Sequence, residues 1–373
     1  MKNCLGIING GNESNNYGGL CNHRPVYMLP FGGRYRLVDI PISMMVNHGI
    51  RTVAIYTGEK IRSTMDHLGN GKPWDLNRRF NGLFLFPPAE GDFNRGDLAQ
   101  YHSTEEFFDR TSEDYVFISH PHILAKVDLT KIFNDFIQSK ADIGLVYKEV
   151  KDPDGELINS PKIHIDEEGR LLNIGMNLGT ESQFNLYLQM AFLKKDVLME
   201  LVKSSLEKAN LHTLRDAILD NKDRYNIRAF QHKGHIENIR DLKSYYDANL
   251  NLFKYKISQD LFFEGGQIFT KTKDEPSTLY KEGSLVQNSI VANGCIIEGS
   301  VENSVIFRGV KIGKGAVVRN SIVMQKSEIQ DNAVVVNSIL DKYVHIEEGV
   351  NIVGNSAIPY VVEKNRKIRK ENM

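Results

Sequence analysis

The stretch NSVIFRGVKIGKGAVVRNSIV, residues 303–323, begins and ends on the same short motif, an Asn-Ser pair followed by two aliphatic residues. The motif occurs four times, starting at Asn288, Asn303, Asn320 and Asn337, at steps of 15, 17 and 17 residues. These steps are close to one turn of a three-sided coil built from six-residue rungs. The spacing therefore predicts a left-handed parallel β-helix of the hexapeptide type.

A six-residue lattice of aliphatic residues supports this prediction, with Glu328 as its one break. We expect the lattice residues to fill the narrow core of the coil, and small or turn-forming residues between them to form corners that need positive φ. An ordinary β-sandwich would instead show period-two strands joined by hairpin turns. The lattice consists of Val310, Ala316, Ile322, Val334, Leu340 and Ile346, and the corner candidates are Gly294, Gly299, Gly309, Gly313, Gly315, Asn332 and Gly349.

The first two thirds of the chain has another pattern, in which short aliphatic runs alternate with helix-like segments. Residues 4–8 (CLGII) are typical of a buried strand, whereas residues 196–206 carry aliphatic side chains at helical spacing. This alternation indicates an α/β domain with a mostly parallel sheet. We therefore divide the chain into an α/β domain (1–250), a linker (251–283) and a β-helix domain (284–373).

Composition and charge exclude several classes of function. With 46 Lys and Arg against 47 Asp and Glu, the net charge of -1 argues against nucleic-acid or membrane-surface binding. The odd set of Cys4, Cys21 and Cys295 has no paired spacing, which favours a reducing compartment over a disulfide framework or a zinc site. No apolar run approaches the ~18 residues of a membrane span or forms a signal-peptide core. We expect a soluble, cytoplasmic protein.

Three separated stretches resemble one family of enzymes, the bacterial ADP-glucose pyrophosphorylases. Residues 29–39 (LPFGGRYRLVD) and 47–51 (NHGIR) resemble the family signature PFGGKYRIIDF…NSGIR. Residues 71–76 (GKPWDL) and 302–310 (ENSVIFRGV) resemble the family's GKPWDL and ENSVLFRGV. The resemblance implies a nucleotidyltransferase-like, Rossmann-like first domain followed by the β-helix.

In active members of this family, glucose-1-phosphate attacks the α-phosphate of ATP and pyrophosphate leaves. The resemblance implies that a glycine-rich loop, an arginine, a lysine and Mg²⁺ neutralise the developing charge. This chain keeps Gly10 and Gly11 of the loop and Arg24 of the following stretch, but has Asn16 for the loop arginine and Val26 for the lysine. We expect Gly10, Gly11 and Arg24 to be a remnant of the nucleotide loop. A tight strand-to-helix turn without a ligand is the alternative for the two glycines.

The resemblance places the two Mg²⁺-binding aspartates of the family at Pro121 and Asn238. Proline has no side-chain ligand, an asparagine offers only a carbonyl oxygen, and Mg²⁺ prefers carboxylates. The nucleotide-recognition stretch GTADAV appears as residues 96–101 (GDLAQY) and keeps only its glycine. Because losing one preorganised contact costs roughly 100- to 1,000-fold in rate, we expect no catalytic residue, metal or cofactor here, and Mg²⁺ only in a catalytic partner subunit. For His120 and His122, a surface turn is favoured over a metal pair.

The family's regulatory residues are kept better than its catalytic ones. Relatives are controlled by anionic metabolites bound between the two domains, and their basic residues match Arg34, Arg51 and the Asp341-Lys342 pair of this chain. The resemblance thus implies an anion site at these four residues, with ordinary interdomain salt bridges as the alternative.

These patterns together predict a GlgD-type, catalytically silent subunit in glycogen synthesis. Family resemblance implies that such a subunit joins a catalytic GlgC-type subunit, as a heterotetramer, and changes its turnover or effector response. Two alternatives are an active glucose-1-phosphate adenylyltransferase with a rearranged site and a free-standing sugar-phosphate or nucleotide sensor.

Overall fold

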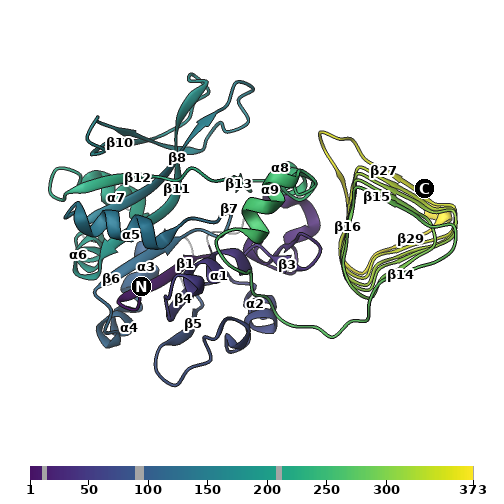
Figure 1. Ribbon diagram of the computed structural model, residues 1–373, viewed down its shortest axis with the longest axis horizontal. Helices are drawn as coiled ribbons and strands as arrows, with labels where there is room; N and C mark the ends of the chain where they lie inside the picture. The colour runs from purple at the N-terminus through teal and green to yellow at the C-terminus, as the bar shows by residue number, and fades with distance from the viewer. Residues whose placement is uncertain (11–14, 89–95, 207–211, 373) are drawn as a thin grey trace.

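The computed structural model describes residues 1–10, 15–88, 96–206 and 212–372. It shows an α/β domain beside a triangular solenoid, which Figure 1 views nearly along the solenoid axis. Both fold types predicted from the sequence are confirmed: a mixed, mostly parallel sheet covered by helices, and a left-handed parallel β-helix. Within the described ranges, no helix combines the length and the apolar character needed to cross a membrane.

The central strands of the α/β domain run in the order β6-β1-β4-β5, and each of these pairings is parallel. β11 adds to β6 in the antiparallel direction and also pairs with β8 and β9. The strands are β1 (Cys4–Asn9), β4 (Thr52–Tyr56), β5 (Gly82–Phe86), β6 (Tyr115–Ser119), β8 (Ile143–Lys151), β9 (Pro161–Ile165), β10 (Leu171–Met176), β11 (Gln183–Lys194) and β12 (Ile227–Gln231).

Both faces of this sheet are buried, which explains why its strands are almost continuously aliphatic. Ile8 packs into a cluster with residues of α1 and α5, whereas Leu5 and Ile7 pack into a cluster with residues of α3, α4, α6 and α7. The helix expected at residues 196–206 is α6. The helices are α1 (Asp39–Asn47), α3 (Gly96–His102), α4 (Glu105–Arg110), α5 (Leu129–Gln138), α6 (Lys195–Leu206) and α7 (Leu214–Asp220).

Three parallel sheets form the sides of the solenoid. The first contains β14 (Leu279–Tyr280), β17 (Ile296–Ile297), β20 (Lys311–Ile312), β23 (Glu328–Ile329), β26 (His345–Ile346) and β29 (Lys367–Ile368). The second contains β15 (Leu285–Gln287), β18 (Ser300–Glu302), β21 (Val317–Arg319), β24 (Val334–Val336) and β27 (Asn351–Val353). The third contains β16 (Ile290–Val291), β19 (Val305–Ile306), β22 (Ile322–Val323), β25 (Ser338–Leu340) and β28 (Tyr360–Val362).

The repeated Asn-Ser motif builds one corner of the solenoid. All four asparagines adopt left-handed backbone angles, with φ of 43° at Asn288, 46° at Asn303 and Asn320, and 48° at Asn337, a conformation that asparagine tolerates better than most residues. Their side chains stack, and the Nδ2 of Asn288 donates to the Oδ1 of Asn303 at 2.6 Å. The serines form a second ladder, in which each hydroxyl oxygen accepts from the next serine's backbone N–H.

The six-residue lattice is wrong in part, because the coils that carry it are offset by 17 residues, as the pairings of Ile306 with Val323 and of Val323 with Leu340 show. A strict six-residue step therefore drifts by one residue in each coil, and Val334 is only half-buried while Val335 fills the interior. Ile322 is fully buried, but it faces the α/β domain rather than the solenoid core. The interior position of that strand belongs to Val323.

The predicted linker boundaries also need correction at both ends. The chain continues after residue 250 through the end of α8 (Leu242–Asn251), α9 (Tyr255–Ser258) and a π-helix (Gln259–Phe263) that buries Leu261 against the α/β domain. The solenoid begins at β14, five residues before the expected boundary. The connecting segment is therefore residues 264–278, which Figure 1 shows as an extended stretch of chain without secondary structure between the two domains.

The third sheet of the solenoid is buried on both sides. Ile306, Val323 and Leu340 fill the interior, while Val305, Ile322 and Ile339 pack with side chains of the α/β domain that include Phe31, Tyr245 and Leu252. Figure 1 shows this sheet, labelled at β16, as the side that faces the α/β domain. Burial of apolar surface on that side fixes the two domains against each other.

The core assignment predicts a large difference between two Val→Asp substitutions in the solenoid. Val323→Asp places an unpaired charge in the interior and should lower the free energy of unfolding by on the order of 3–5 kcal/mol. Val353→Asp introduces the same change where the side chain is 64% exposed and should leave stability nearly unchanged. Thermal or urea unfolding compares the two variants, and equal effects would contradict the interior assignment.

Candidate functional site

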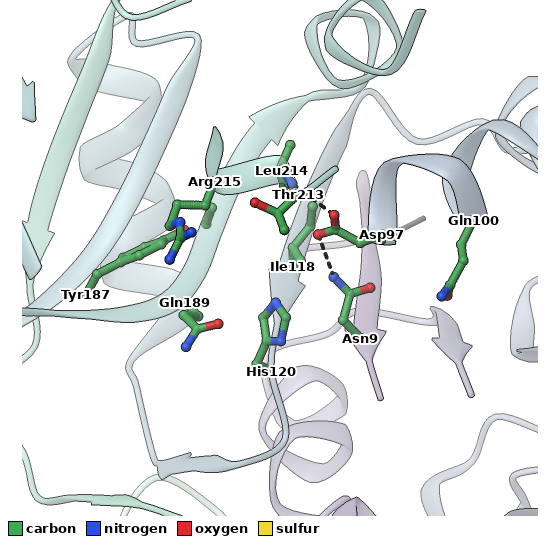
Figure 2. Close-up of a pocket in the computed structure, with 12 residues that line it drawn as sticks. Asn9, Asp97, Gln100, Ile118, His120, Tyr187, Gln189, Thr213, Leu214 and Arg215 are labelled. Carbon is green, nitrogen blue, oxygen red and sulfur yellow. Dashed lines mark hydrogen bonds between the residues drawn. The ribbon is translucent and has the colours of Figure 1, made fainter. Parts of the chain in front are cut away.

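A cavity of about 240 Å³ opens in the α/β domain at the carboxyl ends of the central strands (Figure 2). Asn9 ends β1, His120 follows β6, and Asp97 lies in the first turn of α3. Ligands of open α/β sheets commonly bind at this edge. The lining residues are Asn9, Gly96, Asp97, Gln100, Ile118, His120, Tyr187, Gln189, Ala191, Thr213, Leu214 and Arg215.

Asp97 connects three elements around this cavity. Its Oδ1 accepts from the backbone N–H of Leu214 at 2.9 Å, and its Oδ2 lies 3.4 Å from the Nδ2 of Asn9. The hydroxyl of Tyr101 donates to the Oδ1 of Asn9 at 2.8 Å. Burial raises the pKa of Asp97 to about 6. A phosphate group in the cavity would therefore face an acidic side chain, which disfavours phosphate binding by Coulomb repulsion.

The structure does not bring Gly10 and Arg24, two of the three residues expected to form a nucleotide-loop remnant, together in one site. A Cβ at Gly10 would lie 2.5 Å from the carbonyl oxygen of Tyr56 and 2.7 Å from the ring of Tyr27, so close packing alone requires this glycine. Gly11 lies outside the described residues. The prediction for Arg24 is wrong, because its guanidinium pairs with Asp341 of the solenoid at 2.8 Å and does not line the cavity.

The two positions that the family resemblance assigns to Mg²⁺ ligands lie on adjoining segments, next to the backbone hydrogen bond from Ile239 to the carbonyl oxygen of His122. Asn238, in β13 (Ile236–Asn238), is the register partner of Ile123, which begins β7 (Ile123–Ala125) two residues after Pro121. The Nδ2 of Asn238 donates to the Oγ of Ser160 at 3.3 Å, and Pro121 is buried. In the described part of the chain, no group of three or more His, Cys, Asp or Glu side chains is placed to hold a metal ion. The residues at these two positions do not fit Mg²⁺, which prefers carboxylate ligands.

The turn expected near His120 and His122 is present at residues 121–122, but it is half-buried and not at the surface, and His120 lines the cavity. Their ring centroids are 5.5 Å apart, and both residues are half-buried. Burial lowers the pKa of His120 to about 3 and that of His122 to about 4. Both rings are therefore neutral near pH 7 and supply no positive charge for a phosphate.

Sequence reasoning missed the opposite wall, formed by Tyr187, Gln189, Thr213 and Arg215. Gln189 has a φ of 52° inside a bulge of β11, between Tyr187 and Met190. In the sequence, the only sign of this wall is the run of polar and aromatic residues that forms β11. That run does not indicate a bulge or the direction in which the side chains point.

A second, strongly cationic cavity of about 70 Å³ lies between the domains. The structure brings Arg34 and Lys342 together here, as expected for an anion site. The prediction for Arg51 is wrong, because its Nη1 donates to the carbonyl oxygen of Val46 at the end of α1 and lies elsewhere. The carboxylate of Asp341 is already paired with the guanidinium of Arg24. The lining residues are Arg34, Tyr35, Arg36, His67, Thr270, Lys271, Lys273, Glu275, Arg308, Gln325, Lys326, Lys342 and Tyr343.

The chain is similar to two protein families and to several known proteins. Residues 7–156 match the nucleotidyl transferase family, and residues 276–357 match the GlmU-like, C-terminal hexapeptide family. The chain is 31% identical to the glycogen biosynthesis protein GlgD of Bacillus subtilis, over 84% of this chain and 82% of that protein. It is 34% identical to GlgD of Geobacillus stearothermophilus over the same shares. The chain belongs to the GlgD family.

Catalytic enzymes are similar to this GlgD-family chain at a lower level. The glucose-1-phosphate adenylyltransferase of Clostridium perfringens is 27% identical over 85% of this chain and 82% of that enzyme. The enzyme of Thermotoga maritima is 29% identical over 86% of this chain and 77% of that enzyme.

Basic side chains outnumber acidic ones in the cationic cavity of this GlgD-family chain. Its described lining includes seven Lys or Arg side chains and one acid, Glu275. Burial, together with the nearby charges of Arg36 and Arg24, lowers the pKa of Lys342 to about 6. Burial also lowers the pKa of Arg308, and the neighbouring Arg34 adds to the effect. A bound anion would relieve this repulsion and form charge-assisted hydrogen bonds.

Anion binding in the cationic cavity should depend on pH through Lys342. Below pH about 6 the ammonium is charged, and above that pH it is increasingly neutral, so binding of an anion takes up a proton and weakens as the pH rises. We expect sulfate affinity to fall between pH 6 and 8, by at most roughly tenfold per pH unit. The ring centroid of Trp74, the single tryptophan, lies 6.0 Å from that of His67, which lines this cavity. Tryptophan fluorescence can therefore be used to follow sulfate binding.

Two lysine variants test this assignment. Lys342→Ala should remove most of the pH dependence and weaken sulfate binding, whereas Lys314→Ala, an exposed solenoid lysine outside the cavity, should change neither. An unchanged pH profile in Lys342→Ala would show that another group, such as His67, controls the binding.

Proposed function

We propose that this GlgD-family chain is a regulatory, non-catalytic subunit of a bacterial ADP-glucose pyrophosphorylase, in glycogen biosynthesis. The catalytic GlgC-type subunit would form ADP-glucose and pyrophosphate from ATP and glucose-1-phosphate. The names of the relatives, GlgD glycogen biosynthesis proteins and glucose-1-phosphate adenylyltransferases, support the pathway and the partner. A heterotetramer is the assembly that family resemblance implies.

The observation that carries the proposal concerns Pro121 and Asn238. The family reaction develops concentrated negative charge, and the resemblance assigns its two metal-ligand positions to these two residues, which lie on adjoining segments. Neither residue supplies a carboxylate, and the nearby His120 and His122 are neutral. Preorganised charge stabilisation is usually the largest catalytic contribution, so its loss supports a role other than catalysis.

The solenoid supports a role in assembly. β14, β15 and β16 stand at the ends of their sheets, so one edge of each strand has no neighbouring strand in the described part of the chain. Leu285 and Tyr280 on this first coil are 69% and 51% exposed. Exposed solenoid ends need a cap or a neighbour, and a catalytic subunit with the same type of solenoid would provide one.

The cationic cavity supports a regulatory contribution. An anionic metabolite bound there would contact both domains, because Arg34 belongs to the α/β domain and Lys342 to the solenoid. If the ligand favours one arrangement of the assembled subunits, it shifts the population of that arrangement. Arg34→Ala and Lys342→Ala should each reduce the effector response of the mixed assembly without preventing its formation, as effector titrations of the co-purified enzyme would measure.

The purified chain should form no ADP-glucose above background from ATP, glucose-1-phosphate and Mg²⁺. The physical reason is the missing carboxylates at Pro121 and Asn238. A turnover near ~1 per second, an ordinary enzyme rate, would favour instead an active adenylyltransferase with a rearranged site.

The chain and its catalytic homologue should co-elute in gel filtration as a species larger than either alone. Leu285→Asp should weaken this association, because it charges the exposed solenoid end, while the melting temperature of the isolated chain stays within error. Separate elution of the two wild-type chains at micromolar concentration would favour the free-standing sensor over the subunit.

A further inference from the structure

We propose that the cavity of the α/β domain binds a neutral sugar ring and discriminates against nucleotides and sugar phosphates. This inference goes beyond the proposed regulatory role and does not require a partner subunit. It depends on the size of the cavity, the charge of its walls and the hydrogen-bonding groups that remain unused there.

The size of the cavity favours a small ligand. Its volume is about 240 Å³, whereas sites for drug-sized ligands and cofactors are typically about 300–1,000 Å³. A single hydroxylated ring is therefore a better match than a nucleoside triphosphate.

The charge of the walls disfavours a phosphate. Among the described residues that line the cavity, Arg215 is the only cation and Asp97 the only acid. The Nη2 of Arg215 lies 3.1 Å from the Oδ1 of Asp216, which already offsets its charge. A phosphate that entered the cavity would lose its hydration shell and would instead face Asp97, neutral groups and the guanidinium of Arg215, which is already paired with Asp216. Burying a charge without a full partner is strongly disfavoured.

Several neutral hydrogen-bonding groups remain available for hydroxyls. The amide of Gln100, the ring nitrogens of His120 and the hydroxyl of Tyr187 have no hydrogen bond to any other described residue. Figure 2 shows Tyr187 and Gln189 on one wall, Asn9 and Asp97 on the other, and His120 between them. Amides, a hydroxyl and a neutral imidazole can each donate or accept, which matches the mixed donor and acceptor character of sugar hydroxyls.

Gln189 provides the most specific evidence. Its left-handed φ of 52° is unfavourable for a glutamine, and backbone strain of this kind clusters at ligand sites. Its Nε2 lies 3.2 Å from the Nε2 of His122, which can accept from the amide because this ring is neutral. The contact orients the side chain and leaves the Oε1 of Gln189 available to accept a hydrogen bond from a ligand hydroxyl.

The first experiment measures binding to the full chain by calorimetry and ligand-observed NMR. The probes are D-glucose, maltotriose, glucose-1-phosphate, adenosine and ATP. We expect D-glucose to bind and glucose-1-phosphate to bind at least tenfold more weakly. Tighter binding of maltotriose than of glucose would assign the site to the end of a glucan chain, and the reverse order to a free sugar. Tighter binding of glucose-1-phosphate, adenosine or ATP, or no sugar binding, would overturn the proposal.

The second experiment separates ligand binding from stability. Gln189→Gly removes the amide but suits the left-handed backbone, so it should lower sugar affinity at least fivefold without lowering the melting temperature. Gln183→Gly, at an exposed position of the same strand, should leave affinity unchanged. Unchanged sugar affinity in Gln189→Gly would contradict the assignment. Co-elution with the catalytic homologue should be the same in both variants, so failure of this inference leaves the regulatory role intact.

Discussion

The buried ion pair between Arg24 and Asp341 determines how the two domains meet. The two side chains are 3% and 1% exposed and lie 317 residues apart in the sequence. Removing one partner of such a pair typically costs about 3–5 kcal/mol, because the other charge is left buried and unpaired. The pair is continuous with the apolar contacts of Val305, Ile322 and Ile339. Together they bring Lys342 of the solenoid and Arg34 of the α/β domain into the lining of the same cationic cavity.

Basic and acidic side chains are distributed unevenly between the two cavities of this chain. The cavity at the carboxyl ends of the strands has the neutral His120 and the acidic Asp97, whereas seven Lys or Arg side chains line the cavity between the domains. A fold shared with catalytic relatives does not by itself imply their chemistry. The basic side chains of this chain gather between the two domains, where the proposed anionic ligand would contact both of them.

The architecture was more predictable than the site. The four Asn-Ser motifs identified the solenoid because each marks a corner with a left-handed backbone, a local property of asparagine. The side-chain direction of Ile322, the partner of Arg24 and the position of Arg51 depend on long-range packing, which local periodicity does not encode. Gln189 was missed because a bulge in β11 turns it toward the cavity. Family resemblance located Pro121 and Asn238, and the structure places them on adjoining segments.

The most direct test of the regulatory account is a titration of this chain into an intact catalytic homologue, with ADP-glucose synthesis measured at saturating ATP and glucose-1-phosphate. If the chain acts within an assembly of defined composition, the maximal rate, or the effector concentration for half response, should change and then become constant at a fixed molar ratio. A rate and an effector response that stay the same at every ratio would contradict the regulatory account.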